Sequence, residues 1–249
     1  MTRQRSRIVA TLGATIVTTL GFTASSFAAG FELQEQSGIG LGQAFAGATA
    51  GYGDGSEVYW NPAAMMAIDG TTASASLHTI IPSTSFDDGG SNLPALGGVP
   101  LVGNDGGNGG EVALVPNAYG VTDLIPDKLK FGIGLNVPFG LETQWDDGWT
   151  GRYQALKSEL RTINVNPALA MNVTDNVSIG VGASIMFLDA ELSNAIDFGT
   201  IGVATLGPTT AGSLGLLPQQ ADGKVTLNGD DTAYGVNAGV MIRPTDDIR

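Results

Sequence analysis

Regular alternation of apolar with small or polar residues is the feature that most limits how this chain can fold. It is clearest over residues 177–187, where the odd positions are apolar and the even positions hold Ser, Gly and Met. Successive side chains of a strand point to opposite faces, so a period of two predicts a strand with one apolar face. The same alternation occurs over residues 130–139, 162–173 and 233–242, and more weakly over 71–82 and 111–123. The sequence therefore predicts about six antiparallel strands.

Such strands fit two kinds of all-β protein. In a soluble sandwich or solenoid the apolar face covers a core, whereas in a transmembrane barrel it faces lipid. Gly is abundant, at 37 residues, and charged residues make up only 14%. No apolar run after Phe22 reaches the roughly 20 residues of a membrane-spanning helix. A membrane protein without such helices needs a closed barrel, because unpaired backbone groups are too costly in lipid.

The first 28 residues have the organisation of a signal peptide. Arg3, Arg5 and Arg7 precede an apolar stretch over residues 8–22, and Ser26-Phe27-Ala28 forms an A-x-A-like cleavage site. The alternative is an uncleaved helical anchor, but the apolar stretch is interrupted by Thr and is too short to span a membrane. We therefore expect export, and a mature chain that begins at Ala29.

Removal of this segment leaves an acidic chain. The signal peptide contains three of the 11 basic residues and none of the 24 acidic ones, so the net charge changes from -13 to 8 − 24 = -16. Nucleic-acid-binding proteins need a basic surface, so we expect no nucleic-acid partner. The chain has no cysteine, so packing and backbone hydrogen bonds must stabilise the exported fold in place of disulfides.

The predicted connections are short at one end of the strands and long at the other. Residues 125–127 and 174–176 read as tight turns, which we expect on the periplasmic side. Three long connections rich in Gly, Asp, Ser and Pro are expected to be outward-facing loops, over residues 83–110, 141–157 and 194–222. Trp145 and Trp149 are candidates for an aromatic girdle at the level of the lipid headgroups.

Three short motifs follow the signal peptide in order. They are Ala29-Gly30-Phe31, Gly40-Leu41-Gly42-Gln43-Ala44 and Asn61-Pro62-Ala63. In order and spacing they resemble the mature N-terminus of the FadL family (OMPP1/FadL/TodX type), outer-membrane transporters of long-chain fatty acids and other hydrophobic compounds. The resemblance implies a transmembrane antiparallel β-barrel of fourteen strands whose lumen holds a small N-terminal hatch, or plug, with short helices.

This resemblance defines three expected regions. We predict a signal peptide over residues 1–28, a hatch over residues 29–70 and the first strands of the barrel over residues 71–249. About six strands are fewer than the expected fourteen, and a ring of six would be too narrow to hold the hatch. We therefore expect the chain to be an N-terminal portion of a barrel protein that forms an open, curved sheet with two unpaired edges.

Candidate hatch residues lie at both ends of the predicted plug. The resemblance implies that the extreme N-terminus reaches a ligand pocket, so Phe31 and Leu33 are candidate ligand-binding residues, with packing inside the hatch as the alternative. Asn61 precedes Pro62 and can cap a short helix that begins at that proline. For Asn61 and Pro62 we favour a role in fixing the shape of the hatch over direct contact with a ligand.

The third predicted strand contains a candidate lateral gate at Pro138, Phe139 and Gly140. Proline cannot donate to the ladder and glycine weakens a strand interior, so pairing with a neighbouring strand should break there. In FadL-like channels a kink in the third strand opens a lateral passage, through which a hydrophobic substrate leaves sideways into the membrane. The alternative is that the strand ends at Val137 and a loop begins.

The expected function is passive uptake of a hydrophobic small molecule across the bacterial outer membrane, gated by the plug. Long-chain fatty acids are favoured and aromatic or alkane hydrocarbons are the runner-up, with outer-membrane lipid and lipopolysaccharide as the surroundings. A structural surface protein or adhesin is an alternative supported only by the long loops. We expect no enzyme, cofactor or metal, because His78 is the only histidine and no Gly-x-Ser-x-Gly motif occurs.

Overall fold

The structure, a computed structural model, describes residues 29–93 and 97–244. The predicted signal peptide lies outside the described residues. The chain divides into two compact units, one that ends at Glu32 and one that starts at Leu33. In the first unit, Ala29–Phe31 forms the 3-10 helix η1. The second unit contains the sheet, the rest of the predicted hatch and the long loops.

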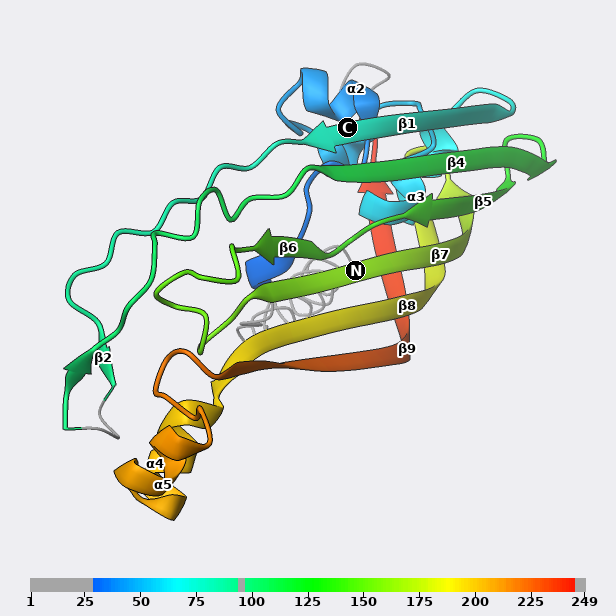
Figure 1. Cartoon of the computed structure of the whole chain (residues 1–249). Helices are drawn as coiled ribbons and strands as arrows, with labels where there is room; N and C mark the ends of the chain where they lie inside the picture. Colours follow the sequence, from blue (N-terminus) through cyan, green and yellow to red (C-terminus); the bar gives the residue numbers. More distant parts are fainter. Residues whose placement is uncertain (1–28, 94–96, 245–249) are drawn as a thin grey trace, which may run out of the picture. The chain divides into compact units, whose positions relative to one another are not determined.

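Seven strands of the second unit form one antiparallel sheet (Figure 1). Six follow the order β1-β4-β5-β7-β8-β9, and the short β6 pairs with β7 beyond the end of β5. Within the described residues, β1 and β9 each have one neighbouring strand, so the sheet is open at two edges, as the sequence predicts. The bounds are β1 Thr72–Ile80, β4 Ala113–Ile125, β5 Leu129–Asn136, β6 Gly140–Gln144, β7 Lys157–Thr174, β8 Val177–Asp197 and β9 Asp222–Ile242.

The two ends of the sheet differ as expected. The connections between β4 and β5 and between β7 and β8 are tight turns, with Asp127 at a φ of 60° in the first of them. We call this the short-turn end and the opposite end the long-loop end. The long connection that follows β1 contains a separate two-stranded ribbon, β2 Asn92–Leu93 with β3 Val99–Pro100.

Two of the predicted loops are partly wrong. The loop expected over residues 141–157 begins with a strand, because β6 pairs with β7 from Gly140↔Arg161 to Gln144↔Lys157. The loop expected over residues 194–222 includes the end of β8 and two helices, α4 Phe198–Leu206 and α5 Pro208–Ser213. The apolar alternation misses the long-loop ends of β8 and β9, because charged residues there replace apolar ones while the ladder continues.

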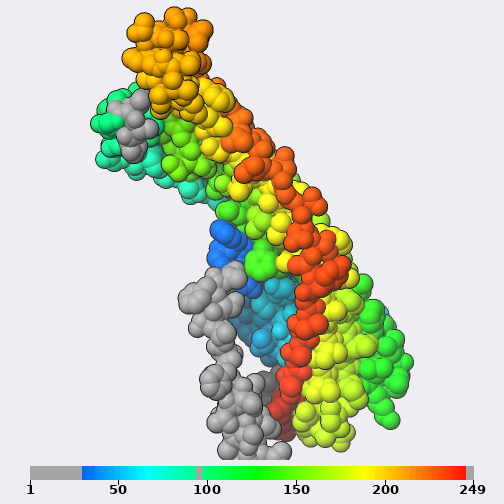
Figure 2. Space-filling model, turned by 90° about the horizontal axis from the view of Figure 1, so that it is seen from below, coloured from blue at the N-terminus to red at the C-terminus, as the bar shows by residue number. Residues whose placement is uncertain are grey.

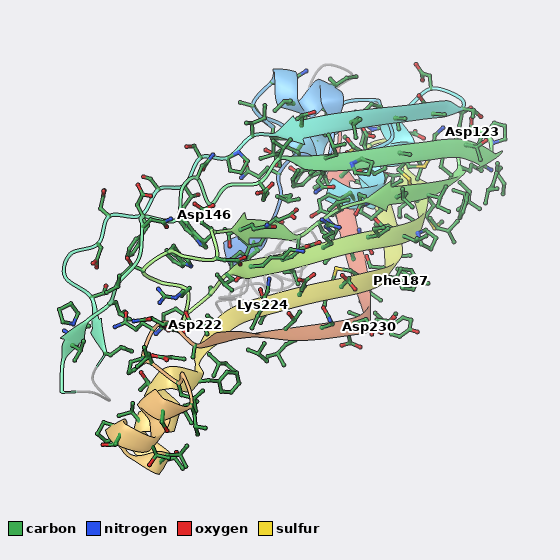
Figure 3. The ribbon with its side chains drawn as sticks, viewed as in Figure 1. Asp123, Asp146, Phe187, Asp222, Lys224 and Asp230 are labelled. Carbon is green, nitrogen blue, oxygen red and sulfur yellow. The ribbon has the colours of Figure 1, made fainter. Side chains whose placement is uncertain are left out.

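The outward face of the sheet carries an apolar band. On β8 the outward residues are apolar from Val177 to Phe187 and become acidic at Asp189 and Glu191. Ten steps of about 3.3 Å along a strand tilted by about 40° cover about 25 Å, the height of the apolar band of outer-membrane barrels. Figure 3 shows Phe187 near Asp230, which pairs with Asp189 in the first charged row.

The inner face of the sheet packs against residues 33–70, the part of the predicted hatch that belongs to the second unit, and we keep the name hatch for these residues. Residues 33–70 contain four short helices, α2 Gly38–Gly42, η2 Ala48–Ala50, α3 Glu57–Trp60 and η3 Pro62–Ala67. Figure 2 shows the cyan hatch residues against the strands coloured from yellow-green to red. The main hydrophobic cluster joins Val58, Met65, Met66 and Ile68 of the hatch to Tyr119, Val121, Ala168 and Ala170 of the strands. The core of the second unit therefore lies between the hatch and the inner face.

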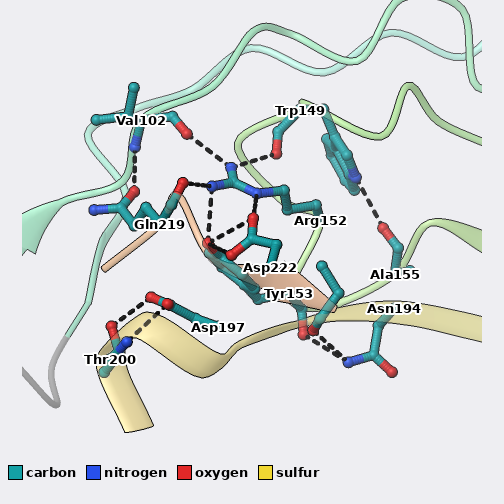
Figure 4. Close-up of polar contacts among 11 residues, drawn as sticks. Val102, Trp149, Arg152, Tyr153, Ala155, Asn194, Asp197, Thr200, Gln219 and Asp222 are labelled. Carbon is teal, nitrogen blue, oxygen red and sulfur yellow. Dashed lines mark hydrogen bonds and ion pairs between the residues drawn. The ribbon is translucent and has the colours of Figure 1, made fainter. Parts of the chain in front are cut away.

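A polar cluster around Arg152 fastens the long loops together (Figure 4). The Arg152 guanidinium is 5% exposed; it pairs with the Asp222 carboxylate at 2.7 Å and donates to the Val102 carbonyl at 2.7 Å. Tyr153 donates to the same carboxylate at 2.9 Å. Burial and this hydrogen bond raise the pKa of Tyr153. Three segments far apart in sequence are thus held by one cation.

The tryptophans next to this cluster are not a lipid-facing girdle. Trp149 is buried, stacks on Trp145 with ring centroids 4.5 Å apart, and meets the edge of Phe86. Their expected place in an aromatic girdle is therefore wrong. The two rings are close in sequence to the end of the third strand, but they fold back onto the loops and form a small core with Leu156 and Ala195.

We predict that Arg152→Ala loosens the loops without unfolding the sheet. Loss of one partner of a largely buried ion pair should cost about 2–3 kcal/mol locally, which corresponds to an acceleration of hydrogen exchange on the order of 100-fold. The amides of Val102 and Phe198 should show this acceleration, and those of the β7–β8 ladder should not. Arg161→Ala is the control, because that side chain is 65% exposed and its ion pairs should be worth no more than about 1 kcal/mol. Equal effects of the two variants would contradict the role of Arg152.

Candidate functional site

Small inward residues of the wall make room for the hatch. A Cβ added at Gly180 would lie 2.4 Å from the Ala63 nitrogen, and one at Gly132 would lie 2.5 Å from Val58 Cγ2. Asn237 donates to the Val58 carbonyl at 3.2 Å. The inward Gly, Ser and Asn residues of the strands therefore form the surface that contacts the hatch. The outward apolar residues lie on the opposite face of the sheet.

The Asn61-Pro62-Ala63 motif fixes the shape and position of the hatch. Asn61 Oδ1 accepts from the Ala63 amide at 3.1 Å and so caps η3, which begins at the buried Pro62. The Asn61 amide donates to the Thr49 carbonyl at 2.9 Å and to the Val240 carbonyl of β9 at 3.3 Å. These contacts use both ends of the Asn61 amide.

Two buried carboxylates organise the tight glycine loop before α3. Glu57, which is 1% exposed, accepts from the amides of Gly53 and Gly55, the latter at 2.9 Å. Asp54 accepts from the hydroxyls of Ser37 and Ser56, each at 2.6 Å. Their partners are serine hydroxyls and backbone amides, so these contacts include no ion pair.

The third strand is interrupted where Pro138 and Gly140 predict a break. Residues 129–136 form β5 and residues 140–144 form β6, and both pair with β7. Between Asn136↔Asn164 and Gly140↔Arg161, residues 137–139 face only residues 162 and 163, so this strand carries an extra residue in the manner of a β-bulge. Thr162 holds the bulge, because its hydroxyl accepts from the Phe139 amide at 3.0 Å and donates to the Phe139 carbonyl at 2.7 Å.

The interruption leaves an unpaired window between β4 and the third strand. Pairing of β4 with β5 stops at Ala118↔Leu135, and a single bridge, Gly110↔Thr143, resumes contact towards the long-loop end. In the described structure no ladder pair joins residues 111–117 to residues 136–142. We call this stretch the wall window.

The hatch segment Leu33–Gln36 spans this window by hydrogen bonds to both margins. On the third-strand margin, the Leu33 amide donates to the Pro138 carbonyl at 2.9 Å, and Gln36 Nε2 donates to the Val137 carbonyl at 2.8 Å. On the β4 margin, Asn117 Nδ2 donates to the Glu35 carbonyl at 2.7 Å. The segment therefore takes the place of the missing ladder partner.

The structure brings together only part of the predicted site. Leu33 lies at the window beside Pro138, and a Cβ at Gly140 would lie 3.1 Å from Leu33 Cδ1. Asn61 is remote from the window, since it binds β9. Phe31 belongs to the first unit and is 51% exposed, and its expected place in a ligand pocket stays a prediction.

Sequence reasoning missed the side chains that carry the contacts. Gln36 and Asn117 are buried, at 0% and 2% exposure, yet neither belongs to a recognisable motif. Asn117 could have been noticed as a side-chain amide at an inward position of a strand with alternating apolar and polar residues. Gln36 gave no local signal, because its partner is 101 residues away.

The part of the chain that the structure describes contains no helix long and apolar enough to cross a membrane. Nor does it hold a group of three or more His, Cys, Asp or Glu side chains arranged to bind a metal ion.

The sheet is antiparallel, has an apolar band on its outer face and packs against the hatch on its inner face. This is the architecture of the wall of a membrane β-barrel. The chain belongs to the family of outer membrane transport proteins described as OMPP1/FadL/TodX, whose model matches residues 19–249. This confirms the predicted family. The family description concerns transport and agrees with the expectation that the protein is not an enzyme.

Individual relatives agree with this assignment. The long-chain fatty acid transport protein of Salmonella typhi is 30% identical over 218 residues, which cover 87% of this chain and 47% of the relative. A 47 kDa outer membrane protein of Pasteurella multocida is 31% identical over 217 residues, with the same coverage. The chain thus spans about half the length of these relatives.

Solved structures share the fold. The crystal structure of a Pseudomonas aeruginosa FadL homologue superposes with a TM-score of 0.66 at 28% identity, covering 88% of this chain and 50% of that chain. A mutant of the TodX monoaromatic hydrocarbon channel has a TM-score of 0.53 at 17% identity, with 77% and 48% covered, and supports the fold alone.

We predict that Gly180→Ala displaces the hatch from the wall. The new Cβ would collide with the Ala63 backbone, and overpacking of this kind costs about 1–3 kcal/mol. The hatch should then be cut faster by protease while heat-modifiable gel migration of the barrel persists. Gly235→Ala is the matched control on the inner face, since its nearest neighbour, Ser184 Cβ, lies 3.5 Å away. Slow cleavage of the hatch in both variants would show that the hatch does not rest on Gly180.

Proposed function

We propose that this protein takes up hydrophobic compounds across the bacterial outer membrane and releases them sideways through the wall window. The observation that carries the proposal is the hatch segment Leu33–Gln36, which closes an interruption of the wall by three hydrogen bonds. A closure made of a few hydrogen bonds can open at modest cost, since each is worth about 0.5–1.5 kcal/mol net. Movement of four residues would connect the inner side of the wall with the lipid.

Lateral release suits an apolar cargo. Each CH₂ group kept out of water saves about 0.8 kcal/mol, so a long acyl chain is far more stable in the membrane than in the periplasm. The outward side chains near the window are apolar, with Leu114, Leu135 and Ile163 between 42% and 61% exposed. A chain that leaves through the window would enter an apolar environment directly.

Long-chain fatty acids are the favoured substrate class. Relatives at about 30% identity are named long-chain fatty acid transport proteins, whereas the monoaromatic hydrocarbon channel is only 17% identical. Aromatic and alkane hydrocarbons remain the second candidate, because the TodX monoaromatic hydrocarbon channel shares the fold. Comparing the accumulation of oleate and toluene in cells that carry or lack the complete gene separates the two classes.

The proposed setting is the outer membrane, after export directed by the signal peptide over residues 1–28. Lipid and lipopolysaccharide would surround the outward apolar band, and the acidic rows that begin at Asp189 and Asp230 would lie among the headgroups. Uptake would be passive, with no cofactor or metal.

A reversible cross-link tests the movement of the hatch segment. Leu33→Cys combined with Gly140→Cys adds one disulfide pair to residues 1–249, which contain no cysteine, at a place where a Cβ on residue 140 would lie 3.8 Å from Leu33 Cγ. Oxidation of the full-length double variant should abolish uptake of radiolabelled oleate, and dithiothreitol should restore it. The measurement is the initial uptake rate, with the two single-cysteine variants as controls.

Unchanged uptake after complete cross-linking, verified by mass spectrometry, would show that the segment does not have to move and would remove the lateral route.

A further inference from the structure

Four buried, uncharged polar side chains lie along the inner side of the wall window. Gln36 comes from the hatch segment, Tyr119 from β4, Asn136 from the last residue of β5 and Asn164 from its partner position on β7. All four are at least 95% buried. A Cβ at Gly134 would lie 2.9 Å from the Tyr119 ring and 3.4 Å from Asn136 Nδ2, so these two side chains lie over the same glycine. We call these four residues the amide cluster.

The two asparagines leave one donor and one acceptor without a partner. Asn164 Nδ2 donates to Asn136 Oδ1 at 3.1 Å. Among the described residues Asn164 Oδ1 has no hydrogen-bond partner, and the one polar group facing Asn136 Nδ2 is the Tyr119 hydroxyl, with which it makes no hydrogen bond of normal geometry. Exchanging the oxygen and nitrogen of both amides would reverse the bond but still leave one NH₂ and one carbonyl free. The pair therefore offers one hydrogen-bond donor and one acceptor, whichever way the two amides are oriented.

Gln36 adds a second free acceptor. Its Nε2 is committed to the carbonyls of Leu33 and Val137, at 2.9 and 2.8 Å, which fixes the orientation of the amide. Its Oε1 is buried and accepts no hydrogen bond from the described residues. Buried acceptors without a donor cost free energy, so a ligand or water that supplies an O–H group would stabilise the cluster.

The electrostatic surroundings oppose an anion. The nearby hatch carboxylates Asp54 and Glu57 accept from serine hydroxyls and backbone amides, and neither forms an ion pair in the described residues. Burial and these two carboxylates raise the pKa of Tyr52, another hatch residue. Lys130 binds the hatch carbonyl of Gly70, but Asp123 neutralises it at the short-turn end.

We propose that the amide cluster is a headgroup subsite for an uncharged, hydroxyl-bearing lipid, either a protonated long-chain carboxylic acid or a long-chain alcohol. The hydroxyl would donate to Asn164 Oδ1, which stays in the wall when the segment Leu33–Gln36 moves, and a carbonyl oxygen would accept from Asn136 Nδ2. A carboxylate has no proton to donate and would face the free carbonyl oxygen of Asn164. This assignment rests on the proposed function, because the cluster becomes accessible only when the segment Leu33–Gln36 moves.

A comparison of substrates with and without a headgroup tests the subsite in the full-length protein. Uptake of hexadecanol, palmitic acid and headless 1-hexadecene is measured in cells that express the wild type or Asn136→Leu. The variant should lower the rates for the alcohol and the acid about tenfold relative to 1-hexadecene, the effect of losing one buried hydrogen bond. Asn172→Leu is the control, because Asn172 lies on the same strand as Asn164 but donates to the Asp127 carbonyl at the short-turn end.

Equal changes for all three compounds, or no change, would overturn the subsite, whereas failure of the wild type to take up any of them would overturn the proposed function instead. If Asn136→Leu does not assemble, the subsite is tested on the wild type by competition between a second lipid and palmitic acid for uptake. Hexadecanol should inhibit uptake of palmitic acid, and the permanently anionic hexadecyl sulfate should not. Equal inhibition by the two compounds would contradict the preference for an uncharged headgroup.

Discussion

The need to pair every backbone group in a sheet that faces lipid is the constraint on which the structure depends. An unpaired carbonyl cannot turn to water in the apolar band, so an interruption of the wall must be closed by other donors. At Val137 and Pro138 these donors are the Leu33 amide and the Gln36 side chain of the hatch. The hatch therefore fills the inner face and also completes the wall at Val137 and Pro138.

Proline alone does not open the wall. Pro167 lies inside β7, opposite Ala183 of β8, where it also lacks a donor. There the neighbouring Asn166 donates its side-chain amide to the Ala183 carbonyl at 2.6 Å, and the register continues unchanged. At Pro138 the strand instead carries an extra residue and loses β4 as a neighbour. The difference lies in the bulge and in the identity of the donor, which at Pro138 comes from a segment more than 100 residues away in the chain.

Much of the fold was predictable from the sequence, because the lipid-facing alternation and the turn residues are local signals. The six principal strands and the turn at Asp127 lie where the pattern predicts them. The ladder beyond Phe187 was not predictable, because outside the apolar band charged residues such as Asp189 and Glu191 take over the outward face. The expectation that aromatic residues next to a strand end lie at the membrane interface misplaced Trp145 and Trp149, which pack among the loops.

Only one part of the site, the break in the third strand, was predictable from the sequence. Pro138 and Gly140 together predict a break in their strand. Which residues close the break depends on contacts between positions far apart in the chain, such as Asn117 with Glu35 and Gln36 with Val137.

Amide exchange at Leu33, measured in the full-length protein in lipid, tests the account most directly, because that N–H donates to the Pro138 carbonyl. The account predicts slow exchange without ligand and faster exchange when a long-chain acid is added. Fast exchange in the absence of ligand, or a rate that the acid leaves unchanged, would contradict it.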